Sequence, residues 1–226
     1  MFYTLIRYVW RIWFYLLTIT TIIILFPILI LTILSDRMYP LFFKLARVWA
    51  YVVFYGMGMR YTLERDYQSI KNKSYIIIAN HGSMLDIMLM LILVKDNPFV
   101  FVGKAELAKI PVFGFIYRRT CILVDRGDVK SRNEVFEAAR DKINNGLSIC
   151  IFPEGGVNDD ISVLLDPFKE GAFRLAIEHQ LPVLPISLYG LKHFFPLKKT
   201  KGIPSRVLAK NHYPIQVEHL EKKKKK

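Results

Sequence analysis

The sequence predicts an α/β domain, in which a mixed, mostly parallel sheet is flanked by helices, behind an N-terminal two-helix membrane anchor. Two observations lead to this prediction. Short runs rich in β-branched residues alternate with helical stretches from about residue 61, which is typical of strands buried on both faces of a sheet. Before them, no charged residue occurs from Ile12 to Ser35, and the chain's excess of hydrophobic residues, 53% overall, is concentrated near this end.

The uncharged run is long enough to cross a membrane. About 23 residues of helix, rising about 1.5 Å each, span roughly 35 Å. Arg7 and Arg11 precede the run, and Asp36 and Arg37 close it. Its length, and the lack of a small-x-small site after it, argue against a cleaved signal peptide. Pro27 is expected to kink this helix rather than end it, because membrane helices tolerate such kinks.

The next stretch, residues 38–61, is predicted to form a second helix at the membrane interface, because it carries Lys44 and Arg47 among aromatic residues. We expect Trp49, Tyr51 and Tyr55 to lie at the depth of the lipid headgroups. The two helices either form a hairpin within one leaflet or combine one true span with one interfacial helix. Residues 1–60 are therefore predicted to be membrane-embedded.

The remaining chain divides into an α/β domain, residues 61–215, and a basic tail, residues 216–226. Strands are expected at residues 74–80, 99–104, 121–126, 147–155 and 181–190, and helices at residues 84–94, 105–119, 131–146 and 169–180. The helix over 131–146 has a serine cap, Ser131, with a glutamate three residues later, and it stops at Gly146. Residues 206–217 are expected to form a terminal hairpin or an edge strand.

The formal net charge of +13 indicates an anionic partner, such as a membrane surface or a phosphate-bearing substrate. Neither zinc-finger spacing nor a basic region with heptads occurs, so we expect no nucleic-acid partner. Cys121 and Cys150 lie in apolar strand-like runs and are predicted to be buried, reduced thiols rather than a disulfide or a metal site. The terminal lysines, residues 222–226, either bind anionic lipid or form a solvated tail.

The stretch "IIIANHGSMLDIMLM", residues 76–90, places a histidine and a carboxylate directly after a buried strand. His81 then lies at the carboxyl end of the sheet, where open α/β sheets bind ligands. Asp86 follows about one turn into the next helix, with Ser83 as the expected N-cap. Asp86 can accept a hydrogen bond from one imidazole nitrogen and leave the other to act as a base. Taken alone, the pair fits either catalysis or a structural cap.

Four motifs, in order, resemble those of the glycerolipid acyltransferases, the family that includes 1-acylglycerol-3-phosphate acyltransferase. "NHGSMLD" resembles its Asn-His-x4-Asp motif, and "KAEL", which begins at Lys104, resembles its Lys-x-Glu-Leu segment. "CILVDR" resembles the second motif and ends in Arg126, and "FPEGG" resembles the third. A Phe-Lys-x-Gly segment and a fourth motif around Pro185 complete a resemblance that runs from about residue 60 to 210.

Two positions depart from the family pattern. Gly156 and Val157 stand where the third motif usually continues with threonine and then arginine or serine. Thr120 stands where the second motif usually opens with glycine. The first departure bears on the identity of the acceptor head group more than on the type of reaction.

The resemblance implies transfer of a fatty acyl group from a thioester to the sn-2 hydroxyl of lysophosphatidic acid, which gives phosphatidic acid. His81 would be the general base and Asp86 its orienting partner. The residues implied in binding the acceptor and its phosphate are Lys104, Arg126, Glu154, Gly155, Gly156 and Lys169. Three of these residues also have a plainer alternative. Arg126 could form a surface ion pair with Asp125 or Asp128, Glu154 could cap a helix, and Lys169 could be a solvated cation.

The resemblance also implies acyl-CoA or acyl-acyl-carrier-protein as the donor, no metal and no redox cofactor. The enzyme would be membrane-bound, with its active site facing the cytoplasm and with lysophosphatidic acid and anionic phospholipids as lipid partners. Two rival hypotheses stay open. One is an acyltransferase for another lysolipid or for an aminolipid. The other is a basic, membrane-bound lipid-binding protein without catalysis.

Overall fold

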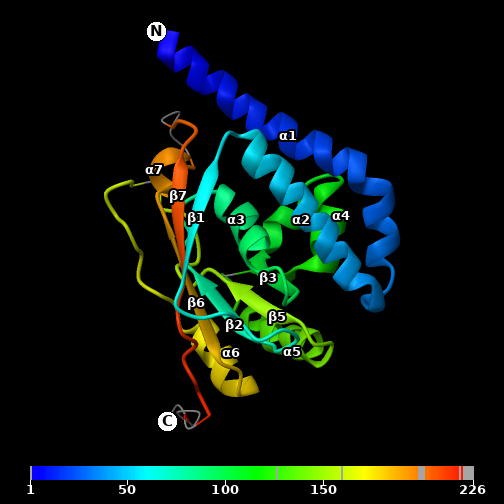
Figure 1. Cartoon of the computed structure of the whole chain (residues 1–226). Helices are drawn as coiled ribbons and strands as arrows, with labels where there is room; N and C mark the ends of the chain where they lie inside the picture. Colours follow the sequence, from blue (N-terminus) through cyan, green and yellow to red (C-terminus); the bar gives the residue numbers. More distant parts are fainter. Residues whose placement is uncertain (1, 126, 159, 198–201, 219, 221–226) are drawn as a thin grey trace.

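The computed structural model describes residues 2–125, 127–158, 160–197, 202–218 and 220. Within them, seven strands form one sheet in the order β1-β7-β6-β2-β5-β3-β4 (Figure 1). All neighbouring strands run parallel except β6 and β7. The mixed, mostly parallel sheet predicted from the sequence is confirmed. The strands are β1 (Arg60–Arg65), β2 (Ile76–Ala79), β3 (Phe99–Lys104), β4 (Ile122–Val124), β5 (Ser148–Ile151), β6 (Val183–Tyr189) and β7 (Arg206–Asn211).

Helices cover both faces of the sheet. The helices are α1 (Phe2–Ile33), α2 (Tyr39–Gly56), α3 (Leu85–Leu93), α4 (Phe113–Thr120), α5 (Val129–Asn144), α6 (Gly171–His179) and α7 (Leu191–Phe194), with 3-10 turns at Asp36–Met38 and Ala105–Lys109. Helices α5 and α6 lie on one side of the sheet, whereas α2, α3 and α4 lie on the other, where α1 crosses over them (Figure 1).

The five predicted strands are all present, but the end of the chain differs from expectation. We expected residues 206–217 to form a terminal hairpin or an edge strand. Instead, β7 lies inside the sheet, parallel to β1 and antiparallel to β6. The edge belongs to β1, which the sequence pattern did not reveal as a strand. Its side chains are exposed or half-buried, so it lacks the continuous apolar run that marks the inner strands.

Two helix caps also differ from expectation. Helix α5 begins at Val129, and its N-cap is Asp128, whose carboxylate accepts hydrogen bonds from the backbone N–H groups of Lys130 and Ser131. Ser131 Oγ instead accepts a hydrogen bond from Asp125 N at 2.9 Å. Asp128 is the N-cap because its backbone is extended, which directs its charged carboxylate at the N–H groups of the first turn. The expected stop holds, since Gly146 follows the helix with φ of +77°.

The cap of α3 is also shifted. Met84, rather than Ser83, is the residue before the first helical residue, Leu85. Ser83 Oγ still accepts a hydrogen bond from Leu85 N at 3.2 Å, so the hydroxyl serves the helix from one position earlier.

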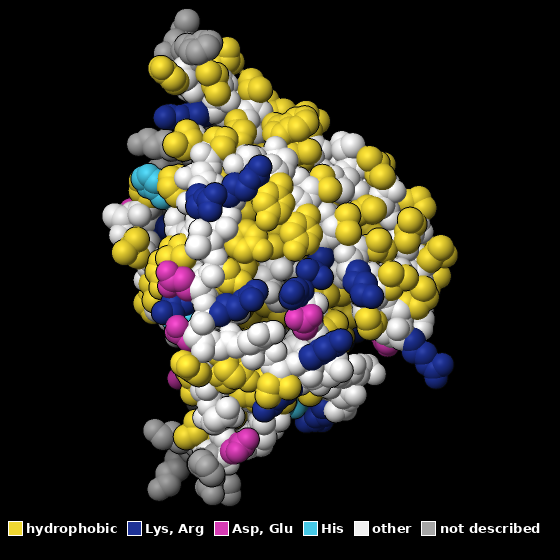
Figure 2. All heavy atoms as spheres, in the orientation of Figure 1, with side chains coloured by type: hydrophobic (Ala, Val, Ile, Leu, Met, Phe, Trp, Pro, Cys, Tyr) yellow, Lys and Arg dark blue, Asp and Glu magenta, His cyan; other side chains and the backbone are white. Residues whose placement is uncertain are grey.

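Helix α1 passes through Pro27 without ending, as predicted. In the described part of the chain it is the one helix that is long and apolar enough to cross a membrane. Figure 2 shows hydrophobic side chains along its outer surface, and Ile23, Ile24 and Leu31 are each at least half exposed. This exposure is what a helix surrounded by lipid requires.

Helix α2 packs one face against the domain. It buries Phe43, Ala50, Val53 and Phe54. Trp49 points toward α1, and its Nε1 donates to Thr18 O at 3.3 Å. The rings of Tyr51 and Tyr55 are stacked on the exposed side, with centroids 5.9 Å apart. The depth of these aromatic residues in a membrane stays a prediction.

One hydrophobic core includes residues from the N-terminal helices and from the sheet. Phe14 of α1, Phe54 of α2, Ile77 of β2 and Ile149 of β5 all belong to it. The domain boundaries after residues 60 and 215 stay predictions, and the lysines of residues 222–226 lie outside the described residues. The packing nevertheless makes the N-terminal helices part of the same folded body.

Candidate active site

His81 and Asp86 are in direct contact at the carboxyl end of β2. The imidazole Nδ1 lies 3.0 Å from Asp86 Oδ2. The same oxygen accepts hydrogen bonds from Gly82 N and Ser83 N, both at 2.7 Å. The Asp86 side chain is 2% exposed and that of His81 is 18% exposed. The structure thus brings together the two side chains that the sequence pairs, and three donors hold the carboxylate.

This geometry favours one tautomer of the neutral imidazole. A carboxylate at Nδ1 favours the tautomer with its proton on Nδ1 and leaves Nε2 as an acceptor. The described part of the chain offers Nε2 no hydrogen-bond partner. Asp86 is the second residue of α3, so its charge also lies near the positive end of the helix dipole. The pair can therefore take a proton from a substrate group at Nε2 and stabilise the resulting imidazolium.

The Phe152 ring packs against one face of the His81 imidazole. The two rings are stacked with centroids 4.1 Å apart and an interplanar angle of 16°. Phe101 of β3 stacks in turn on Phe152 at 5.9 Å. Sequence reasoning included Phe152 only as the first letter of the third motif. An aromatic residue directly after a buried strand was the signal for this support.

Glu154 clamps the backbone around His81. Its Oε1 accepts a hydrogen bond from His81 N at 2.6 Å, and its Oε2 accepts one from Asp166 N at 2.8 Å. The side chain is buried, and it starts no helix, so it is not the helix cap considered as an alternative. It ties the end of β2 to the long loop after β5. Asp166, which the sequence did not single out, completes the tie by accepting a hydrogen bond from Asn158 Nδ2 at 2.9 Å.

Asn80 fixes the strand end from the other side. Its side-chain amide donates to Leu188 O at 2.8 Å and accepts from Leu188 N at 2.7 Å. The side chain therefore imitates one more residue of sheet pairing between β2 and β6. Asn80 is the first residue of the Asn-His-x4-Asp motif, but the sequence alone does not indicate this role.

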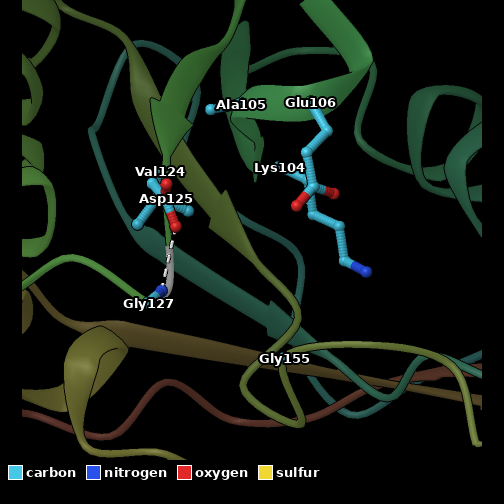
Figure 3. A pocket seen from close by; sticks show the side chains of 7 residues that line it. All are labelled: Lys104, Ala105, Glu106, Val124, Asp125, Gly127 and Gly155. Carbon is cyan, nitrogen blue, oxygen red and sulfur yellow. Dashed lines mark hydrogen bonds between the residues drawn. The ribbon is translucent and has the colours of Figure 1, made fainter.

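A small hollow lies beside the loop that follows β5. It has a volume of about 230 Å³, and its lining residues are Lys104, Ala105, Glu106, Val124, Asp125, Gly127 and Gly155 (Figure 3). Gly155 N donates to Phe152 O at 3.0 Å, so one turn connects the hollow to the ring beneath His81. Glu106 and Asp125 add carboxylates to the hollow, and the sequence analysis named Asp125 only as a possible ion-pair partner of Arg126.

One predicted cation, Lys104, lines this hollow, and a second, Lys169, contacts a glycine of its lining. The Lys169 ammonium lies against Gly155, where a Cβ atom would be only 2.5 Å from Nζ. Gly155 also has a φ of +79°. A side chain at Gly155 would therefore be strained and would displace Lys169. The structure brings Lys104, Gly155 and Lys169 together.

The other predicted binding positions are less defined by the structure. Arg126 lies outside the described residues, although its neighbours Asp125 and Gly127 both line the hollow. Asp125 Oδ1 accepts a hydrogen bond from Gly127 N at 2.9 Å. Gly156 follows Gly155 in the same loop and is half-buried. Thr120, at the position where the family usually has glycine, is buried at the end of α4 and donates to Ile116 O.

The two cysteines are free, as predicted, and neither is activated. Burial raises the pKa of the Cys121 thiol to about 12, and it raises the pKa of the Cys150 thiol well above its ordinary value. Both thiols are therefore protonated near neutral pH and are poor nucleophiles.

Residues 60–189, more than half of the chain, match the family model described as Acyltransferase. The chain belongs to the acyltransferase family. The family resemblance inferred from the four motifs is thus confirmed. The matched region contains His81, Asp86, the hollow and the Glu154 clamp.

Relatives in this family carry a more specific name. The chain is 34% identical over 152 residues to the 1-acyl-sn-glycerol-3-phosphate acyltransferase of Haemophilus influenzae, a match that covers 66% of this chain and 56% of that protein. It is 30% identical over 155 residues to the enzyme of that name from Cocos nucifera, covering 68% of this chain and 49% of that protein. The chain thus spans about half the length of these relatives.

A crystal structure shows the same fold. The 1-acyl-sn-glycerophosphate acyltransferase PlsC from Thermotoga maritima superposes with a TM-score of 0.81 at 23% identity. The match covers 98% of this chain and 90% of that chain. The likeness therefore extends over the N-terminal helices as well as over the acyltransferase region.

Proposed function

We propose that this acyltransferase moves a fatty acyl group from a thioester to the sn-2 hydroxyl of lysophosphatidic acid and so makes phosphatidic acid. The observation that carries the proposal is the buried Asp86 carboxylate, which the backbone N–H groups of Gly82 and Ser83 hold in contact with His81 Nδ1. The names of the relatives from Haemophilus influenzae and Cocos nucifera support the same acceptor.

In the proposed mechanism, His81 Nε2 takes the proton of the acceptor hydroxyl as its oxygen attacks the thioester carbonyl carbon. The new C–O bond gives a tetrahedral intermediate, which collapses as the C–S bond breaks. The imidazolium then returns the proton to the leaving thiolate. Asp86 stays ionised throughout and stabilises the imidazolium. A thioester is already activated for acyl transfer, so we propose that neither a metal ion nor a redox cofactor takes part.

The hollow beside the catalytic loop is the proposed site of the acceptor phosphate. Lys104 lines the hollow and Lys169 lies against Gly155 at its edge, so we assign both to the phosphate. We propose Arg126, the arginine of the second motif, as a third cation. Cations must outnumber Glu106 and Asp125 for a phosphate to bind, and an arginine fork suits phosphate oxygens best.

We further propose that α1 embeds the enzyme in the membrane that holds its acceptor and product. The donor is acyl-CoA or acyl-acyl-carrier-protein, and the active site faces the cytoplasm, where these thioesters are made. The exposed apolar surface of α1 and the +13 charge of the chain support this arrangement.

Product analysis tests the proposal. The full-length chain would be purified in detergent and supplied with labelled oleoyl-CoA or oleoyl-acyl-carrier-protein, together with lysophosphatidic acid, other lysophospholipids or an aminolipid. Thin-layer chromatography should show label in phosphatidic acid, and chelator treatment should leave the rate unchanged. Label in a different lipid alone would replace the acceptor. The absence of acyl transfer to every acceptor would reject the enzymatic function in favour of lipid binding.

A further inference from the structure

The segment from Phe195 to Leu197 lies between the N-terminal helix and the catalytic loop. Arg11 of α1 grips this segment with both ends of its guanidinium. Nη1 donates to Leu197 O at 2.6 Å, and Nη2 donates to Pro196 O at 2.5 Å. The guanidinium carbon also lies 4.7 Å from the centroid of the Phe195 ring. Although Arg11 stands next to an apolar run in the sequence, its charge is directed into the folded domain.

The same segment holds the catalytic loop from its other side. Phe195 O accepts a hydrogen bond from Ser83 Oγ at 2.7 Å. Ser83 N in turn donates to the Asp86 oxygen that contacts His81. Phe195 and Ser83 are both fully buried, so water cannot replace the bond between them. A continuous series of contacts thus runs from Arg11 to the Asp86 carboxylate.

Close packing leaves the residues of this series little room to move independently of one another. A Cβ atom on Gly82 would lie 2.6 Å from Lys192 Cβ, so the catalytic loop touches α7 directly. The Phe195 ring also contacts Trp10 and Phe14 of α1, with centroids 5.3 and 4.9 Å away. A shift of the Phe195 backbone would therefore be passed to Ser83 and Gly82, the two residues whose N–H groups hold Asp86.

Other polar contacts of α1 join it to α2. Trp13 Nε1 donates to Gly56 O at 3.0 Å, which fastens α1 to the end of α2. Trp49 Nε1 of α2 donates back to Thr18 O of α1. These bonds dock the helix without touching the Phe195 segment. They supply a matched control that separates general docking of α1 from the contact made by Arg11.

We propose that Arg11 is a positioning residue for acyl transfer, which acts through Phe195 O and Ser83 on the loop that aims Asp86 at His81. The inference rests on the proposed function and extends it, because it makes the N-terminal helix part of the catalytic apparatus. Small displacements of a general base strongly reduce the rate of proton transfer, whereas substrate binding at the hollow does not depend on Arg11.

The test is a double-mutant cycle in the full-length chain, reconstituted in phosphatidylcholine vesicles that contain lysophosphatidic acid. Arg11→Ala and Ser83→Ala should each lower kcat about tenfold, with both KM values within about twofold of the wild type. Because both act through the Phe195 carbonyl, the double variant should be little slower than the slower single variant. Trp13→Phe should keep kcat within about twofold. The readout is thiol release from the acyl donor.

Three results would overturn the inference: a wild-type kcat for Arg11→Ala, multiplied effects in the double variant, or an equal loss in Trp13→Phe. Thermal unfolding of each variant checks the fold. Should Arg11→Ala fail to fold, Arg11→Lys decides the matter, since lysine keeps the charge and loses the two-pronged grip. Its kcat must then fall at least about threefold with unchanged KM, and a wild-type kcat overturns the inference. A wild-type chain that transfers no acyl group would instead reject the proposed function itself.

Discussion

At the scale of single residues, the proposed catalytic pair, His81 and Asp86, depends on how little freedom Asp86 has. One of its oxygens accepts two backbone N–H groups and the imidazole Nδ1, and the side chain is almost fully buried. Phe152 and the Glu154 clamp restrict His81 in the same way. The surroundings therefore hold the imidazole in one orientation before substrate arrives, which reduces the reorganisation that proton transfer requires.

We expect substitutions of the pair to be severe and non-additive. His81→Ala removes the base and should lower kcat by about 10²- to 10⁴-fold. Asp86→Asn keeps the shape but favours the wrong tautomer, so its loss should be somewhat smaller. The double variant should be little worse than His81→Ala, because the two residues act as a unit. Thiol release from the acyl donor measures each rate.

Thermal unfolding and lysophosphatidic acid binding serve as controls for these variants. Both should stay close to the wild type for His81→Ala, since His81 is not assigned to the phosphate. A fully active His81→Ala enzyme contradicts the mechanism. A variant that is inactive only because it unfolds would return the pair to a structural role.

A second prediction at this scale concerns Arg126. Arg126→Ala should lower kcat/KM for lysophosphatidic acid at least about tenfold, because the acceptor phosphate loses a charged hydrogen-bonding partner. The value of kcat/KM for a phosphate-free monoacylglycerol should fall much less. Arg140, an exposed arginine paired with Glu137 on α5, supplies the matched control, and Arg140→Ala should behave like the wild type. Equal losses with both acceptors would contradict the assignment to phosphate.

At the scale of single elements, α1 has two different surfaces. One surface carries Arg11, Phe14 and other residues that dock onto the domain, and the other exposes aliphatic side chains along most of the helix. The exposed surface gains free energy only when lipid covers it. The same helix can therefore hold the protein in the membrane and hold the catalytic loop in place.

Charge on the exposed surface of α1 should weaken membrane binding. Ile24 is 69% exposed, and Ile24→Asp places a carboxylate where lipid is expected, at a cost of about 3 kcal/mol. Vesicle flotation should then need at least about tenfold more lipid for the same bound fraction. Leu164, 84% exposed in the loop after β5, is the control, and Leu164→Asp should leave the curve in place. Release of the wild type by carbonate alone would contradict the anchor.

At the scale of the whole molecule, the N-terminal helices and the α/β domain share one core. Phe43 of α2 is 2% exposed, and its ring meets Phe99 of β3 edge to face at 5.0 Å. Tyr39 of α2 donates its hydroxyl to Phe99 O at 2.8 Å. Removing the helices would therefore expose a large apolar surface of the domain as well as remove an anchor.

This shared core predicts a single cooperative unfolding transition. Phe43→Ala should destabilise the protein by about 3–5 kcal/mol and lower the midpoint of unfolding of the whole chain in detergent. Val48→Ala, at a half-exposed position of the same helix, should change the midpoint little. Two separate transitions, with the catalytic region unaffected by Phe43→Ala, would show that the helices form an independent domain.

The sequence by itself determined the features that depend on neighbouring residues. The alternation of strands and helices can be predicted from the sequence, because buried strands need short, continuous apolar runs and helices need caps and stops. The contact between His81 and Asp86 was also predictable, because five residues across a strand end and one helical turn leave few alternatives. The uncharged run from Ile12 to Ser35 predicts a long apolar helix there, although α1 already begins at Phe2. The family follows from four short motifs in order.

Only the tertiary structure decided the features that join distant parts of the chain. Glu154 contacts the backbone of His81 across 73 positions, and Arg11 contacts Pro196 across 185. The inner place of β7 and the burial of α2 depend on the same long-range packing. A charged residue beside an apolar run looks alike whether it faces lipid headgroups or a buried carbonyl, because local composition does not specify which distant surface a side chain meets. That choice is made when the core closes, since only then do buried polar groups need particular partners.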